Sequence, residues 1–269
     1  MKTWALALFT LKESLKSRTV IAGLIVSLVY LTLIPALSTG GGGISANPAG
    51  AHGPAGEDFL SLALAGLNMI GMAMAVFISL GAIREEIDSG MISIIIAKPV
   101  RRWQVFVGKW AGHSMLMGVY VLAVGLVLWL PVAVGTGDRA WSFMPALLLT
   151  SLNVITLVTL TMALSIAMPA VANAVSVFII FALTSSTRIA DAISTASGSV
   201  LTGAVANLLR MLLPVGQVGS ESNMLLSAKS VPGPAFLFMP PAWSFLYELL
   251  YIAAVIALAT YFFARMDLG

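Results

Sequence analysis

Long apolar runs without a charged side chain alternate along this chain with more polar segments that hold nearly all of its charge. Each run has close to the length of about 20 residues that one helix needs to cross a bilayer. We therefore predict six transmembrane helices, with Pro169 separating the fourth from the fifth because proline interrupts a helix. The predicted spans are approximately Val20–Leu37, Phe59–Ile83, Gly112–Val134, Phe143–Met168, Ala170–Thr187 and Ala242–Ala264.

The composition agrees with a membrane environment. Of 269 residues, 59% are hydrophobic and 9% are charged, and the mean hydropathy is +1.00. Soluble domains carry about 25% charged residues. We expect an all-α membrane protein whose single transmembrane domain covers residues 1–269, in the cell membrane (the inner or plasma membrane) of a prokaryote. Its scattered charges form no basic stripe, which argues against nucleic-acid binding. It has no cysteine and two histidines, which leaves no thiolate or multi-histidine metal site.

The positions of Lys and Arg predict the orientation. With the N-terminus inside, ten of the 14 basic residues fall on the inner side and four on the outer side. The positive-inside rule therefore predicts that both termini are cytoplasmic. A signal peptide cleaved near Ser45–Ala51 is the alternative, but the charged leader and the apolar run after it are both too long for one.

Two segments outside the spans have helical patterns of their own. In residues 1–18 the apolar positions Trp4, Leu8, Leu11 and Leu15 recur at helical spacing, which predicts a helix lying on the inner leaflet. The alternative is a cytoplasmic extension of the first span. In the external link, residues 185–240, a stripe over Val205–Leu212 stops before Pro214, which predicts an outer interfacial or re-entrant helix.

The inner link, residues 84–110, concentrates eight charged residues between the second and third spans. An acidic cluster precedes the apolar run Met91–Ala97, which Pro99 ends, and a basic pair follows. An acidic start and a basic end favour a helix through its macrodipole. This pattern is typical of an element that docks a soluble partner. The alternative is that the basic residues are only snorkelling anchors at the membrane interface.

The order of residues in this link is similar to that of a known family. The residues that carry the likeness are Glu85, Glu86, Gly90, Lys98, Pro99, Val100, Arg101, Arg102, Gly108 and Lys109. With the six-span plan, the leading helix and the long external link, the chain resembles over essentially its whole length the permease subunits of ABC transporters in the type-two exporter class.

This resemblance implies a dimer, of identical or related permeases, on two ATP-binding subunits, with the link holding a coupling helix. It implies polar contacts to the partner from Glu85, Glu86 and Asp88, apolar contacts from Met91, Ile92 and Ile95, and membrane anchoring by Arg101, Arg102 and Lys109. The chain lacks a G-x-x-x-x-G-K-[ST] run, so ATP and Mg²⁺ are expected on the partner and no cofactor on this chain. It is therefore not expected to be an enzyme itself.

Few ionisable side chains fall inside the predicted spans, which disfavours an ion-coupled carrier. Thr150, Asn153 and Thr161 lie near one face of the fourth span, where they line a substrate pathway or form hydrogen bonds between helices. Glu248 is the only acid inside a span. It is either an outer-gate or substrate contact or an interfacial residue near water. No Ser-His-Asp set is visible in the sequence, and no pair of carboxylates lies within the spans for acid-base catalysis.

Two functions fit these observations. The first is a transport subunit that moves its substrate outward with energy from ATP hydrolysis by its partner. The second is a non-transporting membrane anchor or sensor that recruits a soluble protein through the same link.

Overall fold

The computed structural model describes residues 2–15, 17–39, 54–80, 82, 102–136, 143–181 and 240–265. These ranges contain seven α-helices and no strand. The helices are α1 (Lys2–Leu15), α2 (Arg18–Thr39), α3 (Pro54–Ser79), α6 (Arg102–Thr136), α7 (Phe143–Ala167), the short helix (Ala170–Phe181) and α11 (Pro240–Arg265). The expectation of an all-helical protein is confirmed for this part of the chain.

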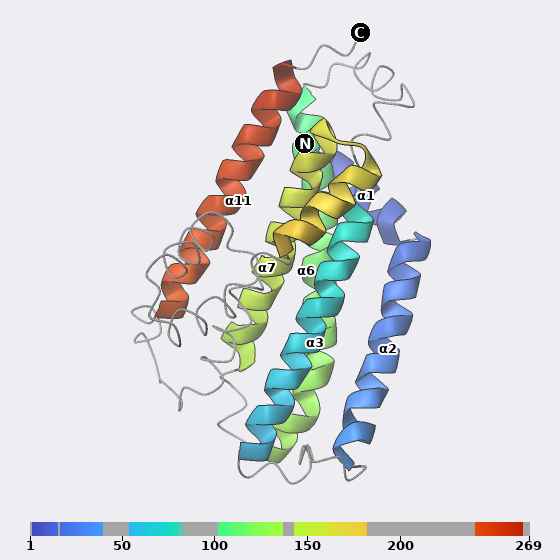
Figure 1. Ribbon diagram of the computed structural model, residues 1–269, viewed down its shortest axis with the longest axis vertical. Coiled ribbons are helices and arrows are strands. Elements are labelled where there is room, and N and C mark those ends of the chain that lie inside the picture. The colour runs from blue at the N-terminus through green and yellow to red at the C-terminus, as the bar shows by residue number, and fades with distance from the viewer. Residues whose placement is uncertain are drawn as a thin grey trace, which may run out of the picture.

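The helices form a bundle with α3, α6 and α7 side by side in the middle (Figure 1). Helix α2 packs on α3 at one side, and α11 packs on α6 and α7 at the other. The apolar core lies among the three central helices, where Phe106, Phe143 and Leu157 are almost fully buried. Helix α11 joins this core near its end, where the rings of Phe106 and Phe263 lie 6.4 Å apart.

Four helices are long and apolar enough to cross a membrane, and two shorter apolar helices accompany them. The four spans are Leu62–Ser79, Trp103–Leu130, Phe143–Ala167 and Phe245–Arg265. The two shorter segments, Thr19–Leu33 and Ala170–Phe181, coincide with the first and fifth predicted spans. The membrane character of the protein is supported, whereas the count of six crossings stays a prediction.

Helices α1 and α2 are separate, so α1 is not a straight extension of the first span. Ser17 lies between them, and its hydroxyl accepts a hydrogen bond from the Val20 amide at 3.3 Å, the arrangement of an N-cap. Helix α1 packs against the first part of α6 through Ala7 and Thr10 and leaves Phe9 exposed. Its location at the membrane surface stays a prediction.

The break at Pro169 is confirmed, because α7 ends at Ala167 and the short helix begins at Ala170. The carbonyl of Pro169 accepts a hydrogen bond from the Asn173 amide at 3.0 Å and so starts the new helix. The third span differs from its predicted start, since α6 begins at Arg102 rather than at Gly112. Buried contacts of Val105 and Phe106 hold this additional part within the bundle.

Candidate functional site

The three predicted pathway residues of α7 lie inside the bundle of this single chain. Thr150, Asn153 and Thr161 are at most 1% exposed. The two threonine hydroxyls donate to carbonyls of their own helix, Thr150 to Ala146 at 2.9 Å and Thr161 to Leu157 at 2.8 Å. A hydroxyl satisfied in this way presents mainly its methyl group to the neighbouring helix. In this arrangement the two threonines act as packing surfaces, and their place on a pathway stays a prediction.

Asn153 forms a tie between helices. Its Nδ2 donates to Oδ1 of Asn68 on α3, at 3.1 Å. The sequence analysis did not select Asn68. An amide inside a membrane is expected to hydrogen-bond to a polar side chain of a neighbouring helix, which is the signal that could have identified it. Asn173 forms a second tie, because its Nδ2 donates to the carbonyl of Thr161 at 2.9 Å and fastens the short helix to α7.

A third tie joins α6 to α7. The indole nitrogen of Trp110 donates to the hydroxyl of Thr159 at 2.8 Å. Farther along α6, the hydroxyls of Tyr120 and Ser27 form a hydrogen bond that connects α6 to α2. Every central helix is therefore joined to a neighbour by at least one polar contact between side chains.

Glu248 lies in the first third of α11 and is 2% exposed. The protein rather than the surroundings encloses its carboxylate. An ionisable side chain inside a membrane span is costly and marks a functional site by default. Burial makes a freely hydrated interfacial residue a poor description of Glu248, and its role on a pathway stays a prediction.

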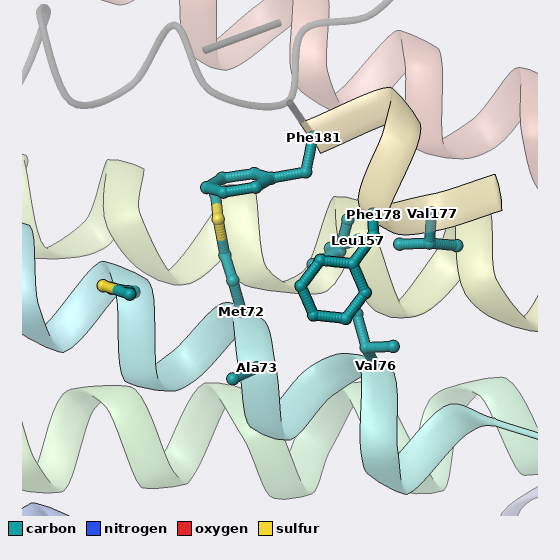
Figure 2. A pocket seen from close by; sticks show the side chains of 8 residues that line it. Met72, Ala73, Val76, Leu157, Val177, Phe178 and Phe181 are labelled. Atoms are coloured by element: carbon teal, nitrogen blue, oxygen red, sulfur yellow. The ribbon is translucent and has the colours of Figure 1, made fainter. Parts of the chain in front are cut away.

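An apolar cavity of about 180 Å³ lies between α3, α7 and the short helix (Figure 2). Phe178 and Phe181 reach from the short helix toward α3, where Met72 and Val76 lie (Figure 2). The lining consists of Met69, Met72, Ala73, Val76, Leu157, Val177, Phe178 and Phe181. Apart from the thioether sulfurs of Met69 and Met72 the lining is hydrocarbon, so this cavity suits an apolar group.

The inner link connects the end of α3 to the beginning of α6, and these two parts of the bundle are in contact. The Lys109 ammonium donates to the carbonyl of Ala82, 2.8 Å away. One turn along α6, Nδ1 of the buried His113 is 2.9 Å from the Lys109 carbonyl. Lys109 therefore bonds to protein at both its side chain and its backbone.

Comparison with known proteins identifies the family. A family model described as ABC-2 family transporter protein matches residues 4–268. This chain belongs to the ABC-2 transporter family. It is also 29% identical over 72 residues to the uncharacterized transmembrane protein YxlG of Bacillus subtilis (strain 168), which covers 27% of this chain and 28% of that protein.

Membership of the ABC-2 transporter family, together with the four long apolar helices, supports a membrane-embedded protein. ABC-2 permeases usually work with a separate ATP-binding subunit and are typically not catalytic themselves. In the ranges that the structure describes, no cluster of three or more His, Asp or Glu side chains is arranged to hold a metal ion.

Several predicted site residues lie outside the described residues. These are Glu85, Glu86, Asp88, Met91, Ile92, Ile95 and Arg101, together with the helical stripe Val205–Leu212. Arg102 is the first residue of α6. Of the three predicted membrane anchors, Lys109 is the one whose contacts are described, and its ammonium is directed to a backbone carbonyl.

Proposed function

We propose that this chain is the permease subunit of an ATP-driven ABC transporter that moves its substrate out of the cell. Two copies, identical or related, form the membrane part, and two separate ATP-binding subunits supply the energy and hold ATP and Mg²⁺. The observation that carries the proposal is the family match over residues 4–268. The absence of a phosphate-binding G-x-x-x-x-G-K-[ST] run from the sequence supports a separate energy source.

The inner link is the element through which the ATP-binding subunit acts. In this proposal Glu85, Glu86 and Asp88 form polar contacts with the partner, and Met91, Ile92 and Ile95 enter an apolar groove on it. The burial of a few apolar side chains, surrounded by polar contacts, is how protein interfaces usually gain their affinity. The basic pair, Arg101 and Arg102, anchors the link at the membrane surface, and both chain termini lie on the same, cytoplasmic side.

The proposal also assigns a substrate pathway within the bundle. In this proposal the apolar cavity beside α7 and the polar residues Thr150, Asn153 and Thr161 belong to the substrate pathway. Glu248 contributes to an outer gate or a substrate contact. Its test is Glu248→Gln, which keeps the shape of the side chain and removes its charge. The proposal predicts reduced ATP-dependent transport, and transport equal to wild type removes Glu248 from the pathway.

The test of the main proposal uses the full chain expressed with its ATP-binding subunit. Substituting Met91, Ile92 and Ile95 together by Ser is expected to reduce ATP hydrolysis by the purified complex at least fivefold. A matched control replaces the exposed α2 residues Ile25, Leu28 and Val29 by Ala, and it should leave hydrolysis within twofold of wild type. A stable complex whose ATP turnover ignores the link substitutions would instead support a non-transporting anchor or sensor.

A further inference from the structure

One hydrogen bond joins the two places where the inner link meets the described bundle. The residues described before the link end at Ala82, and those described after it begin with Arg102, the first residue of α6. The ammonium group of Lys109 donates to the carbonyl of Ala82 at 2.8 Å. The contact therefore connects α6 to the segment that follows the last turn of α3.

The position of this contact gives it strength. The last carbonyls of a helix have no partner in the helix and carry the negative end of its dipole. Beyond Ser79 the chain turns, and the Ala82 amide donates to the Ser79 carbonyl at 3.3 Å. A half-buried ammonium at this point complements the end of α3, and a charged donor makes a stronger hydrogen bond than a neutral one.

The backbone of Lys109 belongs to a closely packed part of α6. His113 is 5% exposed and pairs with the Lys109 carbonyl. Next to it, Gly112 lies against α1, and a Cβ atom at this position would be 2.8 Å from the Ala7 carbonyl oxygen. The beginning of α6 is therefore held by α1 on one side and, through Lys109, by the end of α3 on another.

A membrane anchor would behave differently. A snorkelling lysine extends its ammonium group toward water or lipid headgroups while its methylenes cover apolar surface. The Lys109 ammonium donates an N–H group to a backbone carbonyl within its own chain. Because that acceptor belongs to the backbone, a side-chain substitution at Ala82 retains it, and only a change of Lys109 removes the donor.

We infer that Lys109 is a positioning residue, which fixes the end of α3 to α6 so that a force on the inner link moves both helices together. This inference rests on the proposed function, since it explains how a displacement of the link by the ATP-binding subunit reaches the bundle. Without the tie, the two ends of the link move independently, and the displacement is absorbed locally.

The first test measures the tie itself, in the full chain without its partner. The chain has no native cysteine, so spin labels can be placed on Phe77→Cys and Trp103→Cys, which are exposed positions near the inner ends of α3 and α6. Lys109→Met is expected to at least double the width of the distance distribution between the labels. Lys109→Arg keeps a charged donor and should give a distribution nearly as narrow as wild type. Lys12→Met removes an exposed lysine from α1 and should change nothing.

The second test measures coupling in the complex with the ATP-binding subunit. Labels on Leu62→Cys and Leu148→Cys, exposed positions on α3 and α7, report the ATP-driven change within the bundle. Lys109→Met should retain ATP hydrolysis within threefold of wild type and lose at least two thirds of that change. If Lys109→Met does not fold, Lys109→Gln, which removes the charge and shortens the side chain, should give an intermediate loss.

The outcomes separate the two proposals. A distribution for Lys109→Met as narrow as wild type overturns the inference, and so does a full ATP-driven change in that variant. Failure of the wild-type chain to retain any ATP-binding subunit overturns the proposed function, independently of Lys109.

Discussion

Helices α7 and α11 are almost equally apolar, but α7 is central in the bundle and α11 is peripheral. Their spans have mean hydropathies of 2.0 and 1.8, yet 67% of the α7 span is buried inside the protein and 17% of the α11 span. Hydropathy therefore identifies both as membrane helices without indicating which is central. The difference lies in the side chains that each presents to its neighbours.

Helix α7 is rich in small hydroxyl residues whose hydroxyl groups hydrogen-bond to backbone carbonyls of the same helix. Thr156 and Thr159, like Thr150 and Thr161, donate to carbonyls four residues earlier in the same helix. Small residues let helix backbones approach each other closely in membranes. Helix α11 instead exposes large side chains such as Tyr261 and Phe262, and the Arg265 guanidinium lies 4.4 Å from the Tyr261 ring centre. That combination suits the outer surface of a bundle near the membrane interface.

The largest expected effect is on the free energy of unfolding, when a buried leucine in α7 and an exposed leucine in α11 are each replaced by alanine. Leu157 is 1% exposed and Leu250 is 62% exposed. Leu157→Ala should lower the free energy of unfolding by about 2–5 kcal/mol, because it leaves a void beside the existing cavity. Leu250→Ala should have little effect. Reversible unfolding in mixed micelles measures both, and equal losses would contradict the assignment of inside and outside.

A second comparison tests how closely α6 approaches α7. A Cβ on Gly125 would overlap the side chain of the buried Leu147, so Gly125→Ala should cost about 1–3 kcal/mol of unfolding free energy. At Gly118 the added Cβ would meet Ile155 at an ordinary 3.7 Å. Gly118→Ala should therefore be neutral or stabilise by up to about 1 kcal/mol, since alanine is the better helix former. Thermal unfolding should show a lower midpoint for Gly125→Ala and an unchanged or higher one for Gly118→Ala. Equal decreases in the two variants would contradict the close contact at Gly125.

The smallest expected effect is the coupling between Asn68 and Asn153. A double-mutant cycle with alanine at both positions should give about 0.6 kcal/mol, and at most about 1.7, the range measured for hydrogen bonds between membrane helices. The cycle that pairs Asn68 with Thr150→Val is the control, because that hydroxyl bonds within its own helix. Equal coupling energies in the two cycles would remove the direct contact as the cause.

The sequence predicts elements much better than partners. Apolar runs and Pro169 predict the helices and the break after α7, because both depend on local properties of the chain. The bond from Lys109 to Ala82, the pair of Asn68 and Asn153, and the burial of Glu248 depend on how each helix is rotated. Rotation is weakly encoded in spans that are apolar on every side, so these contacts required the folded chain.

The earlier start of α6 has a similar explanation. The charges at Arg102 and Lys109 suggested a segment outside the span, but the apolar side chains between them pack into the bundle. Charge alone marks where a membrane helix meets the interface and not where the helix begins. The role of the residues from Glu85 to Ile95 in docking the partner remains a prediction.

The central claim is that the inner link of this ABC-2 protein touches a separate ATP-binding subunit. Cross-linking from single cysteines in the cysteine-free chain tests it most directly, with Ile92→Cys in the link and Met69→Cys on the exposed side of α3. We predict a covalent adduct with the co-expressed ATP-binding subunit from position 92 and none from position 69. A complex that purifies intact but yields no adduct from any position between 85 and 95 would contradict the account.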